Sequence, residues 1–333
     1  MSNSILKDLL KEYDTKKINA EKKADLNKKL IFEKYPELEE IENKLNSIGI
    51  ESAKAILSSN NPNILSELNL NIQTLKNTKN ELLKKYNISE SDLLPNYDCK
   101  YCKDTGYITS DNSTVMCTCL KQKLINSLYN KSNIYNLDKE NFNTFNINLY
   151  SEEINKEKYK SDISPKENIL KIKNIVTSFI NNFDDLNEKN LLFTGNTGLG
   201  KTFLSNCIAK ELINKGKIVI YQTAPVMLDS IIDYRFGKNN ISDEYYNDLI
   251  NCDLLIIDDL GTESINSLKF TELFNIINTR LLNQNNKSLK TIISTNLTLQ
   301  NLFSNYDERI VSRIVGYYNI CRFFGNDIRF NKK

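Results

Sequence analysis

One glycine-rich motif, GNTGLGKT at residues 195–202, most constrains the fold of this chain. It stands between the apolar run LLFT and the helical pattern FLSNCIAKELI. The pattern GxxxxGK[ST] between a strand and a helix is typical of a loop whose backbone N–H groups surround phosphate oxygens at a helix N-terminus. A chance glycine-rich turn is the alternative, and this context disfavours it. The predicted nucleotide-binding residues are Gly195, Asn196, Thr197, Gly198, Leu199, Gly200, Lys201 and Thr202.

Two adjacent acids follow another apolar run, LLII, and complete a predicted magnesium site. From residue 190 onward, short apolar runs alternate with helical patterns, which predicts a parallel sheet covered by helices on both faces. Ligands of such sheets bind at the carboxyl ends of the strands. We expect Lys201 to reach the β- and γ-phosphates, Thr202 and Asp258 to hold Mg²⁺, and Asp259 to orient or deprotonate the attacking water. A strand followed by a solvated acidic turn is the alternative.

Three further polar residues are candidates for the same chemistry. Asn296 follows the apolar run TIIST and is suited to bind the γ-phosphate or the lytic water, although a turn or helix cap is an equally good interpretation. Arg309 and Arg313 lie four residues apart in ERIVSRIVG, so they share one face of a predicted helix. Either they complete the phosphate site of a neighbouring subunit, or they belong to an ordinary surface helix.

Four of the seven cysteines lie between residues 99 and 119. The chain has no histidine, so a metal must be held by thiolates or carboxylates. Two close pairs separated by a turn-rich loop predict a four-thiolate Zn²⁺ site. A redox CxxC motif is the alternative, but it leaves the second pair unexplained. The predicted zinc ligands are Cys99, Cys102, Cys117 and Cys119, whereas Cys207, Cys252 and Cys321 read as small buried hydrophobic residues.

Composition limits the partners and the compartment. Lys and Arg number 44 against 42 Asp and Glu, a net charge of +2, so any surface that binds nucleic acid must be local. The first residues lack the apolar core of a signal peptide, and no stretch approaches the length of a membrane span. We therefore expect a cytoplasmic protein without a membrane partner, in a compartment where disulfides are rare.

Helical patterns fill the first ninety residues and recur before the nucleotide motif. Apolar residues three and four apart predict helices with breaks at Gly49, at Asn61-Pro62 and finally at Pro95. These helices form either a small solvated bundle or a surface whose apolar stripes dock a partner. Further along, Ser164-Pro165-Lys166-Glu167 predicts a helix start with a capping box.

Together these motifs resemble those of the AAA+ ATPases that load the bacterial replicative helicase, the DnaC/DnaI type. The resemblance rests on GNTGLGKT, on IIDDLGTE at 256–263, on STN at 294–296 and on ERIVSRI at 308–314. It covers about residues 140–333, and the transposition helper IstB shares the ATPase motifs. The resemblance implies an α/β AAA+ P-loop domain with a short or absent lid, preceded by a helical and zinc-binding N-terminal region.

The resemblance also assigns roles to single residues. It makes Lys201 and Thr202 the Walker A residues, Asp258 and Asp259 Walker B, and Asn296 sensor 1. It further makes Arg313 the arginine finger, with Arg309 beside it, and Arg329 a sensor 2-like arginine. The segment FNTFNINLYS resembles the one that flanks the adenine. We expect four parts: helices at 1–94 that bind the helicase, a zinc module at 95–130, a linker at 131–163 and the ATPase domain at 164–333.

The function that the resemblance implies is ATP-dependent loading of a DnaB-type hexameric helicase onto single-stranded DNA. ATP would drive self-association through the AAA+ domain, and the expected cofactors are ATP, Mg²⁺ and Zn²⁺. One alternative is an IstB-like ATPase that assists a transposase on duplex DNA. Another is a zinc-dependent adaptor whose nucleotide serves only as a structural element.

Overall fold

The computed structural model describes residues 2–58, 62–110, 113–128, 137, 139–237, 243–264, 266–284 and 286–331. The chain divides into two compact units, residues 3–117 and 118–333, which we describe separately. Part of the predicted linker, residues 131–136 and 138, lies outside the described residues. Among the described helices, none combines the length and the apolar character needed to cross a membrane.

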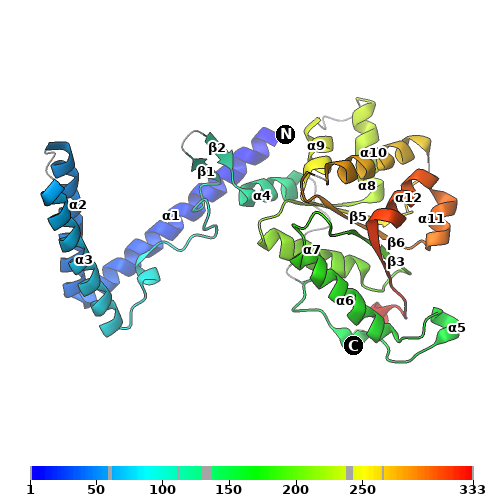
Figure 1. The fold of residues 1–333 in the computed structure, drawn as a ribbon, viewed down its shortest axis with the longest axis horizontal. Helices are drawn as coiled ribbons and strands as arrows, with labels where there is room; N and C mark the ends of the chain where they lie inside the picture. The colour runs from blue at the N-terminus through cyan, green and yellow to red at the C-terminus, as the bar shows by residue number, and fades with distance from the viewer. Residues whose placement is uncertain are drawn as a thin grey trace. The chain divides into compact units, whose positions relative to one another are not determined.

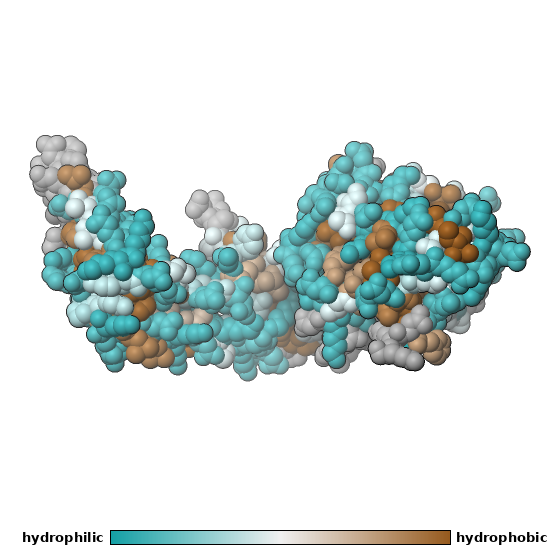
Figure 2. All heavy atoms as spheres, turned by 90° about the horizontal axis from the view of Figure 1, so that it is seen from below, coloured by the Kyte–Doolittle hydropathy of each residue, from teal (hydrophilic) through white to brown (hydrophobic). Residues whose placement is uncertain are grey.

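The first unit is helical and has a small core. Its helices are α1 (Ser2–Lys34), α2 (Pro36–Ser58) and α3 (Pro62–Lys85), followed by the short η1 (Glu90–Leu93) and the hairpin of β1 (Tyr107–Ser110) and β2 (Ser113–Met116). Leu38, Leu83 and Leu93 form a buried cluster where these helices meet. Glu42 of α2 accepts hydrogen bonds from Lys28 of α1 at 2.9 Å and Lys79 of α3 at 2.7 Å. Figure 2 shows mostly hydrophilic residues on the drawn face of α2 and α3.

The helix breaks of this unit are only partly those predicted. Pro62 begins α3 as expected, but α2 continues through Gly49 to Ser58, so the break predicted at Gly49 is wrong. One glycine costs a helix about 1 kcal/mol, which is too little to interrupt it. The break that the sequence interpretation missed lies before Pro36, where the proline ring excludes the preceding residue from helical geometry.

A five-stranded parallel sheet forms the centre of the second unit (Figure 1). Its strands are β3 (Asn190–Thr194), β4 (Val219–Thr223), β5 (Leu254–Leu260), β6 (Lys290–Thr295) and β7 (Tyr318–Arg322), in the spatial order β4-β5-β6-β3-β7. The first four are the predicted apolar runs, and they are almost entirely buried. The parallel sheet brings the carboxyl ends of β3, β5 and β6 to one edge, where the motif residues follow.

Helices cover both faces of this sheet, as predicted. On one face lie α6 (Pro165–Asn181) and α7 (Lys201–Asn214). On the other lie α8 (Ala224–Arg235), α9 (Asp243–Asn251), α10 (Ser267–Asn283) and α12 (Glu308–Tyr317), with α11 (Leu299–Asn305) before α12. The remaining elements are α4 (Thr118–Leu128), η3 (Ile147–Leu149), α5 (Lys156–Tyr159) and η4 (Ile328–Asn331). Figure 1 shows α6 and α7 below the sheet and the α8–α12 group above it.

Side chains satisfy open backbone groups at the start of α6 and at the edge of β4. Ser164 caps α6 by accepting the Glu167 N–H at 3.1 Å, as predicted, but the Glu167 carboxylate pairs with Lys171 at 3.0 Å. At the sheet edge, the Gln122 amide of α4 bonds both backbone groups of Val219, accepting at 2.7 Å and donating at 3.0 Å. This amide therefore satisfies part of the open edge of β4.

Candidate functional site

The glycine-rich motif forms a tight loop between β3 and α7. Gly195 has a φ of +142°, and a Cβ atom there would lie 2.2 Å from the Phe323 carbonyl oxygen. Gly198 has a φ of +75°, and a Cβ atom there would lie 2.1 Å from the Asp327 carboxyl group. Only glycine fits both positions, because each combines a left-handed backbone with close contact.

The segment after β7 holds this loop through backbone hydrogen bonds. Phe323 N–H donates to the Thr194 carbonyl at 2.7 Å, and Ile328 N–H donates to the Gly198 carbonyl at 2.9 Å. A residue that precedes the loop in the sequence also contacts it: the Tyr150 hydroxyl donates to the Leu199 carbonyl at 3.0 Å. Burial raises the pKa of Tyr150, so its phenol remains a donor. The loop is thus fixed by one segment that precedes β3 and one that follows β7.

Lys201 and Asn296, separated by 95 residues, meet at this loop. The buried Lys201 ammonium donates to the carbonyls of Gly195 at 2.6 Å and Asn196 at 2.8 Å, and to Asn296 Oδ1 at 2.8 Å. Burial lowers the pKa of Lys201, while the charges of Asp259 and Asp258 oppose that shift. A phosphate oxygen is a stronger acceptor for these donors than a neutral carbonyl.

Thr202 and Asp258 form a set of oxygen donors suited to a hard cation. The Thr202 hydroxyl donates to Asp258 Oδ2 at 3.1 Å, which leaves the hydroxyl lone pairs free. Asp258 is only 4% exposed at the end of β5. Mg²⁺ prefers carboxylate and hydroxyl oxygens next to phosphates, so these two residues fit the predicted metal.

Asp259 differs from its neighbour in conformation and environment. Its φ is +55°, in the left-handed region that few non-glycine residues adopt. Burial raises the pKa of Asp259, the charge of Asp258 raises it further, and Lys201 opposes the shift. Such strain is often found at functional sites.

Sequence reasoning missed two residues that contact Asp258. The Tyr221 hydroxyl of β4 donates to Asp258 Oδ2 at 2.7 Å, and the Ser294 hydroxyl of β6 donates to Oδ1. Burial raises the pKa of Tyr221 well above its usual value, followed by the charge of Asp258. Period-two alternation places each side chain on one face of its own strand, but the contact with Asp258 follows from the register between strands.

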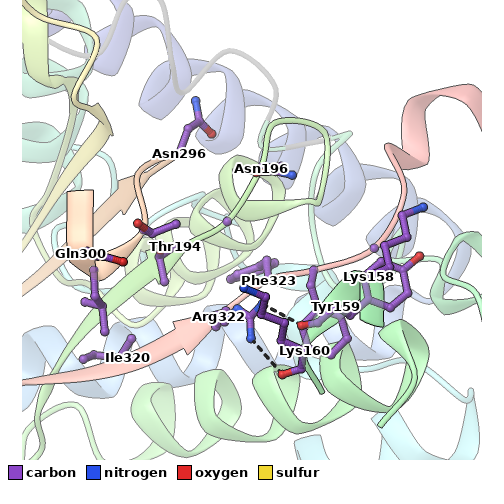
Figure 3. A pocket seen from close by; sticks show the side chains of 15 residues that line it. Lys158, Tyr159, Lys160, Thr194, Asn196, Asn296, Gln300, Ile320, Arg322 and Phe323 are labelled. Atoms are coloured by element: carbon purple, nitrogen blue, oxygen red, sulfur yellow. Dashed lines mark hydrogen bonds between the residues drawn. The ribbon is translucent and has the colours of Figure 1, made fainter. Parts of the chain in front are cut away.

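A pocket of about 540 Å³ opens beside the loop, at the carboxyl ends of β6, β3 and β7 (Figure 3). Gly195, Asn196 and Asn296 belong to its wall. Its charged residues are Lys158, Lys160 and Arg322, and no acid is among the fifteen residues that line it. The Arg322 guanidinium donates to the Tyr159 carbonyl at 2.7 Å. The pocket therefore favours an anion next to the phosphate loop.

The predicted arginines have different polar partners, although Arg309 and Arg313 both lie over the Phe274 ring. Arg313 stacks on Phe274 with its guanidinium carbon 4.6 Å from the ring centre, and it donates to Asn278 at 2.8 Å. Arg309 binds the Asp307 carboxylate through two contacts of 2.9 Å. Arg329 pairs with Asp327, the residue that lies against Gly198. Among the contacts of the described residues, none joins Arg313 to the phosphate loop of its own chain.

The four cysteines predicted as zinc ligands converge. Their sulfur atoms all lie within 4.8 Å of one another, and those of Cys99 and Cys117 are 3.9 Å apart. Thiolates on one Zn²⁺ at about 2.3 Å would lie about 3.8 Å apart, so the cluster fits a tetrahedral site. The buried Asp104 carboxylate accepts the Asp98 and Cys99 N–H groups at 2.9 and 2.8 Å, which fixes the first pair.

The remaining cysteines are buried, as predicted. Cys207, Cys252 and Cys321 are at most 3% exposed. Burial raises the pKa of the Cys207 and Cys321 thiols to about 12, and it also raises that of Cys252. These thiols therefore remain protonated and act as packing groups.

The second unit is similar to known ATP-binding proteins. The family model of the IstB-like ATP binding protein matches residues 153–329. The replicative helicase loader DnaC of Escherichia coli (strain K12) is 25% identical over 173 residues, which are 52% of this chain and 67% of DnaC. DnaC of Buchnera aphidicola subsp. Baizongia pistaciae (strain Bp) is 28% identical over 137 residues, 41% of this chain and 54% of the relative.

Solved structures with similar folds include AMPPCP-bound DnaA from Aquifex aeolicus. It is 26% identical with a TM-score of 0.42, and this chain spans about half of it, 49% of each chain being covered. The sheet and phosphate loop described above confirm the predicted α/β AAA+ P-loop fold, and the DnaC relatives confirm the predicted resemblance. Because the family match extends over more than half of the chain and includes every residue from Gly195 to Arg329 discussed here, the chain belongs to the family of IstB-like ATP binding proteins.

Proposed function

We propose that this protein is an ATP-dependent loader of the replicative DNA helicase, which it delivers to single-stranded DNA. The observation that supports this best is the similarity to a helicase loader over the same residues that build the site. The E. coli relative is named as a replicative helicase loader, and 67% of its length is matched. The similarity therefore extends well beyond the phosphate loop.

In this proposal the chain's own residues bind and orient ATP. Lys201 exchanges its carbonyl acceptors at Gly195 and Asn196 for phosphate oxygens, and Asn296 stays close enough to bind the γ-phosphate. Bound Mg²⁺, held by Thr202 and Asp258, would neutralise charge on the phosphates. Asp259 orients the attacking water and accepts its proton.

Hydrolysis in this proposal acts as a switch. Arg313 of the neighbouring copy would complete the ATP-binding site at the boundary between two copies. The nucleotide state and self-association would therefore depend on each other. Turnover would be slow, because the useful output is assembly, binding of single-stranded DNA and release of the helicase.

The first unit is the proposed contact with a DnaB-type hexameric helicase. Its helices carry large apolar side chains in solvent, among them Leu26 and Leu30 at 63% and 64% exposure, one helical turn apart on α1. A Zn²⁺ ion on the cysteine cluster would stabilise the segment from Cys99 to Cys119 and take no part in catalysis.

Co-purification with the cognate helicase tests the proposal most directly. We expect capture of the helicase and its transfer to single-stranded DNA with ATP, and loss of transfer in Lys201→Ala. Lys189→Ala is the matched control, because Lys189 is exposed directly before β3. Unchanged nucleotide binding and helicase transfer by Lys201→Ala would contradict the proposed function.

A second function is favoured by one observation, the family model itself, which describes an IstB-like ATP binding protein. Under that alternative the chain assists a transposase on duplex DNA. ATP turnover stimulated by duplex DNA but not by single strands, with no capture of the helicase, would support it. Absence of turnover with either DNA would instead support the adaptor with a structural nucleotide.

A further inference from the structure

Asp258 is surrounded by hydroxyl groups from three different elements. Tyr221 on β4 and Thr202 on α7 both donate to Oδ2, at 2.7 and 3.1 Å. Ser294 on β6 donates to Oδ1, which also accepts the Asp259 N–H at 3.0 Å. Four donors therefore meet the two oxygens of one carboxylate that is 4% exposed.

The strand register accounts for this convergence. Thr223 of β4 pairs with Asp258, so Tyr221, two residues earlier, points to the same face of the sheet. Ile257 pairs with Ile293, which makes Asp258 and Ser294 neighbours on that face. Tyr221 is 1% exposed and its ring packs in the apolar cluster beneath α7, so its hydroxyl approaches Asp258 from within the core.

This geometry bears on how Thr202 meets a metal. A hydroxyl has one proton, and donating it to Asp258 directs the lone pairs of Thr202 away from the carboxylate. The direction holds only while Oδ2 keeps its position. Tyr221 shares that oxygen and is fixed by packing, whereas Ser294 fixes the other one. Residues that orient ligands in this way typically contribute a factor of about 10 to 100 to metal affinity.

We propose that Tyr221, assisted by Ser294, is a positioning residue for the magnesium site of this ATPase. Its phenol holds the Asp258 carboxylate so that Thr202 presents its lone pairs to the metal. The proposal rests on the proposed ATP-binding function and adds a residue of β4, a strand that otherwise contributes nothing to the site. Loss of the Tyr221 hydroxyl should therefore raise the Mg²⁺ concentration needed for nucleotide binding. Nucleotide binding without metal should stay unchanged.

The test is a titration of a fluorescent ATP analogue bound to the full chain with Mg²⁺, starting in EDTA. Tyr221→Phe should raise the Mg²⁺ concentration at half-maximal binding by about tenfold, with unchanged binding in EDTA. Bound Mn²⁺, counted by electron paramagnetic resonance, should fall in parallel. Ser294→Ala gives a second route to the same shift and serves if Tyr221→Phe folds poorly.

Tyr318→Phe is the matched control, because Tyr318 is a buried tyrosine of the same sheet whose hydroxyl bonds Thr291. It should leave the Mg²⁺ requirement at the wild-type value. An unchanged requirement in folded Tyr221→Phe and Ser294→Ala would overturn the inference, as would an equal loss of binding in EDTA and in Mg²⁺. Lys201→Ala separates the two proposals: if it still binds nucleotide, the proposed function itself fails.

Discussion

Asp258 and Asp259 are adjacent carboxylates that the fold gives different environments. Asp258 is enclosed by the hydroxyls of Thr202, Tyr221 and Ser294 and cannot turn freely. The Asp259 backbone N–H donates to Asp258 Oδ1 at 3.0 Å and to the Ser294 hydroxyl at 3.2 Å, and the residue has a left-handed φ of +55°. A carboxylate held by three hydroxyls suits a metal, whereas the raised pKa of Asp259 suits proton transfer.

Replacing Asp259 should separate nucleotide binding from ATP hydrolysis. Asp259→Asn keeps the size of the side chain and removes the base, so we expect ATP turnover to fall by about 100-fold or more. Nucleotide affinity should remain close to wild type, because Lys201 and Thr202 are unchanged. Single-turnover hydrolysis and equilibrium binding measure the two effects. Equal loss of affinity and turnover would contradict the assignment of Asp259 as the base.

At this scale, the residues predicted from sequence are those fixed by a local motif. The loop, Lys201 and the acid pair follow from short patterns, and the meeting of Lys201 with Asn296 follows from the rule that parallel strands end at one edge. The contact of Tyr221 with Asp258 depends on the register between β4 and β5, which no local pattern specifies.

Among the elements, β7 was not predicted although it completes the sheet. Its residues, YNICR, lack a continuous apolar run, because an edge strand is partly exposed and only Tyr318 and Cys321 are buried. The strand forms by pairing with β3, Leu192 opposite Ile320. Buried central strands have an apolar sequence signature, whereas an edge strand is specified by its partner.

The cysteine module is the element whose structure should depend on a metal. We expect one zinc per chain by metal analysis, since four thiols converge and none of the described side chains of the β1–β2 hairpin is buried. Cys117→Ser together with Cys119→Ser should lose the zinc and expose this segment to proteolysis.

A matched control for this variant is Cys207→Ser, because Cys207 is a buried cysteine of α7 outside the cluster. It should keep the zinc even if it loses stability. Chelation of the wild type should reproduce the proteolysis pattern of the double variant, and nucleotide binding by the second unit should persist. Less than half an equivalent of zinc in freshly purified protein would contradict the predicted site.

At the scale of the whole molecule, the two units differ in the size of the apolar core that stabilises each of them. The second unit has two extensive apolar clusters, one on each face of its sheet. The cluster around Leu38 in the first unit is small, and many of its helical apolar residues remain exposed. A unit of this kind is suited to gain stability from a partner. A second unit with its own large core and a first unit suited to bind a partner are what the proposed loader requires.

ATP hydrolysis by an assembly of several copies should depend on Arg313 more than on Arg309. The Asp307 carboxylate neutralises Arg309, whereas the Arg313 guanidinium contacts the neutral groups of Phe274 and Asn278 and has no acidic partner among the described ion pairs. Its charge therefore remains available to a phosphate of another copy. An arginine supplied in this way contributes up to about 10³-fold or more to hydrolysis in other nucleotidases.

Mixing two inactive variants tests this assignment. Arg313→Ala should bind ATP like the wild type but lose hydrolysis stimulated by single-stranded DNA, and Asp259→Asn should be inactive for the other reason. When the two are combined, some boundaries between copies pair an intact Asp259 with an intact Arg313, so activity should return to a fraction of the wild-type rate. Arg309→Ala, as the control, should retain most of the stimulated activity. Absence of any recovery in the mixture, with both variants folded and self-associating, would show that Arg313 does not act on a neighbouring copy.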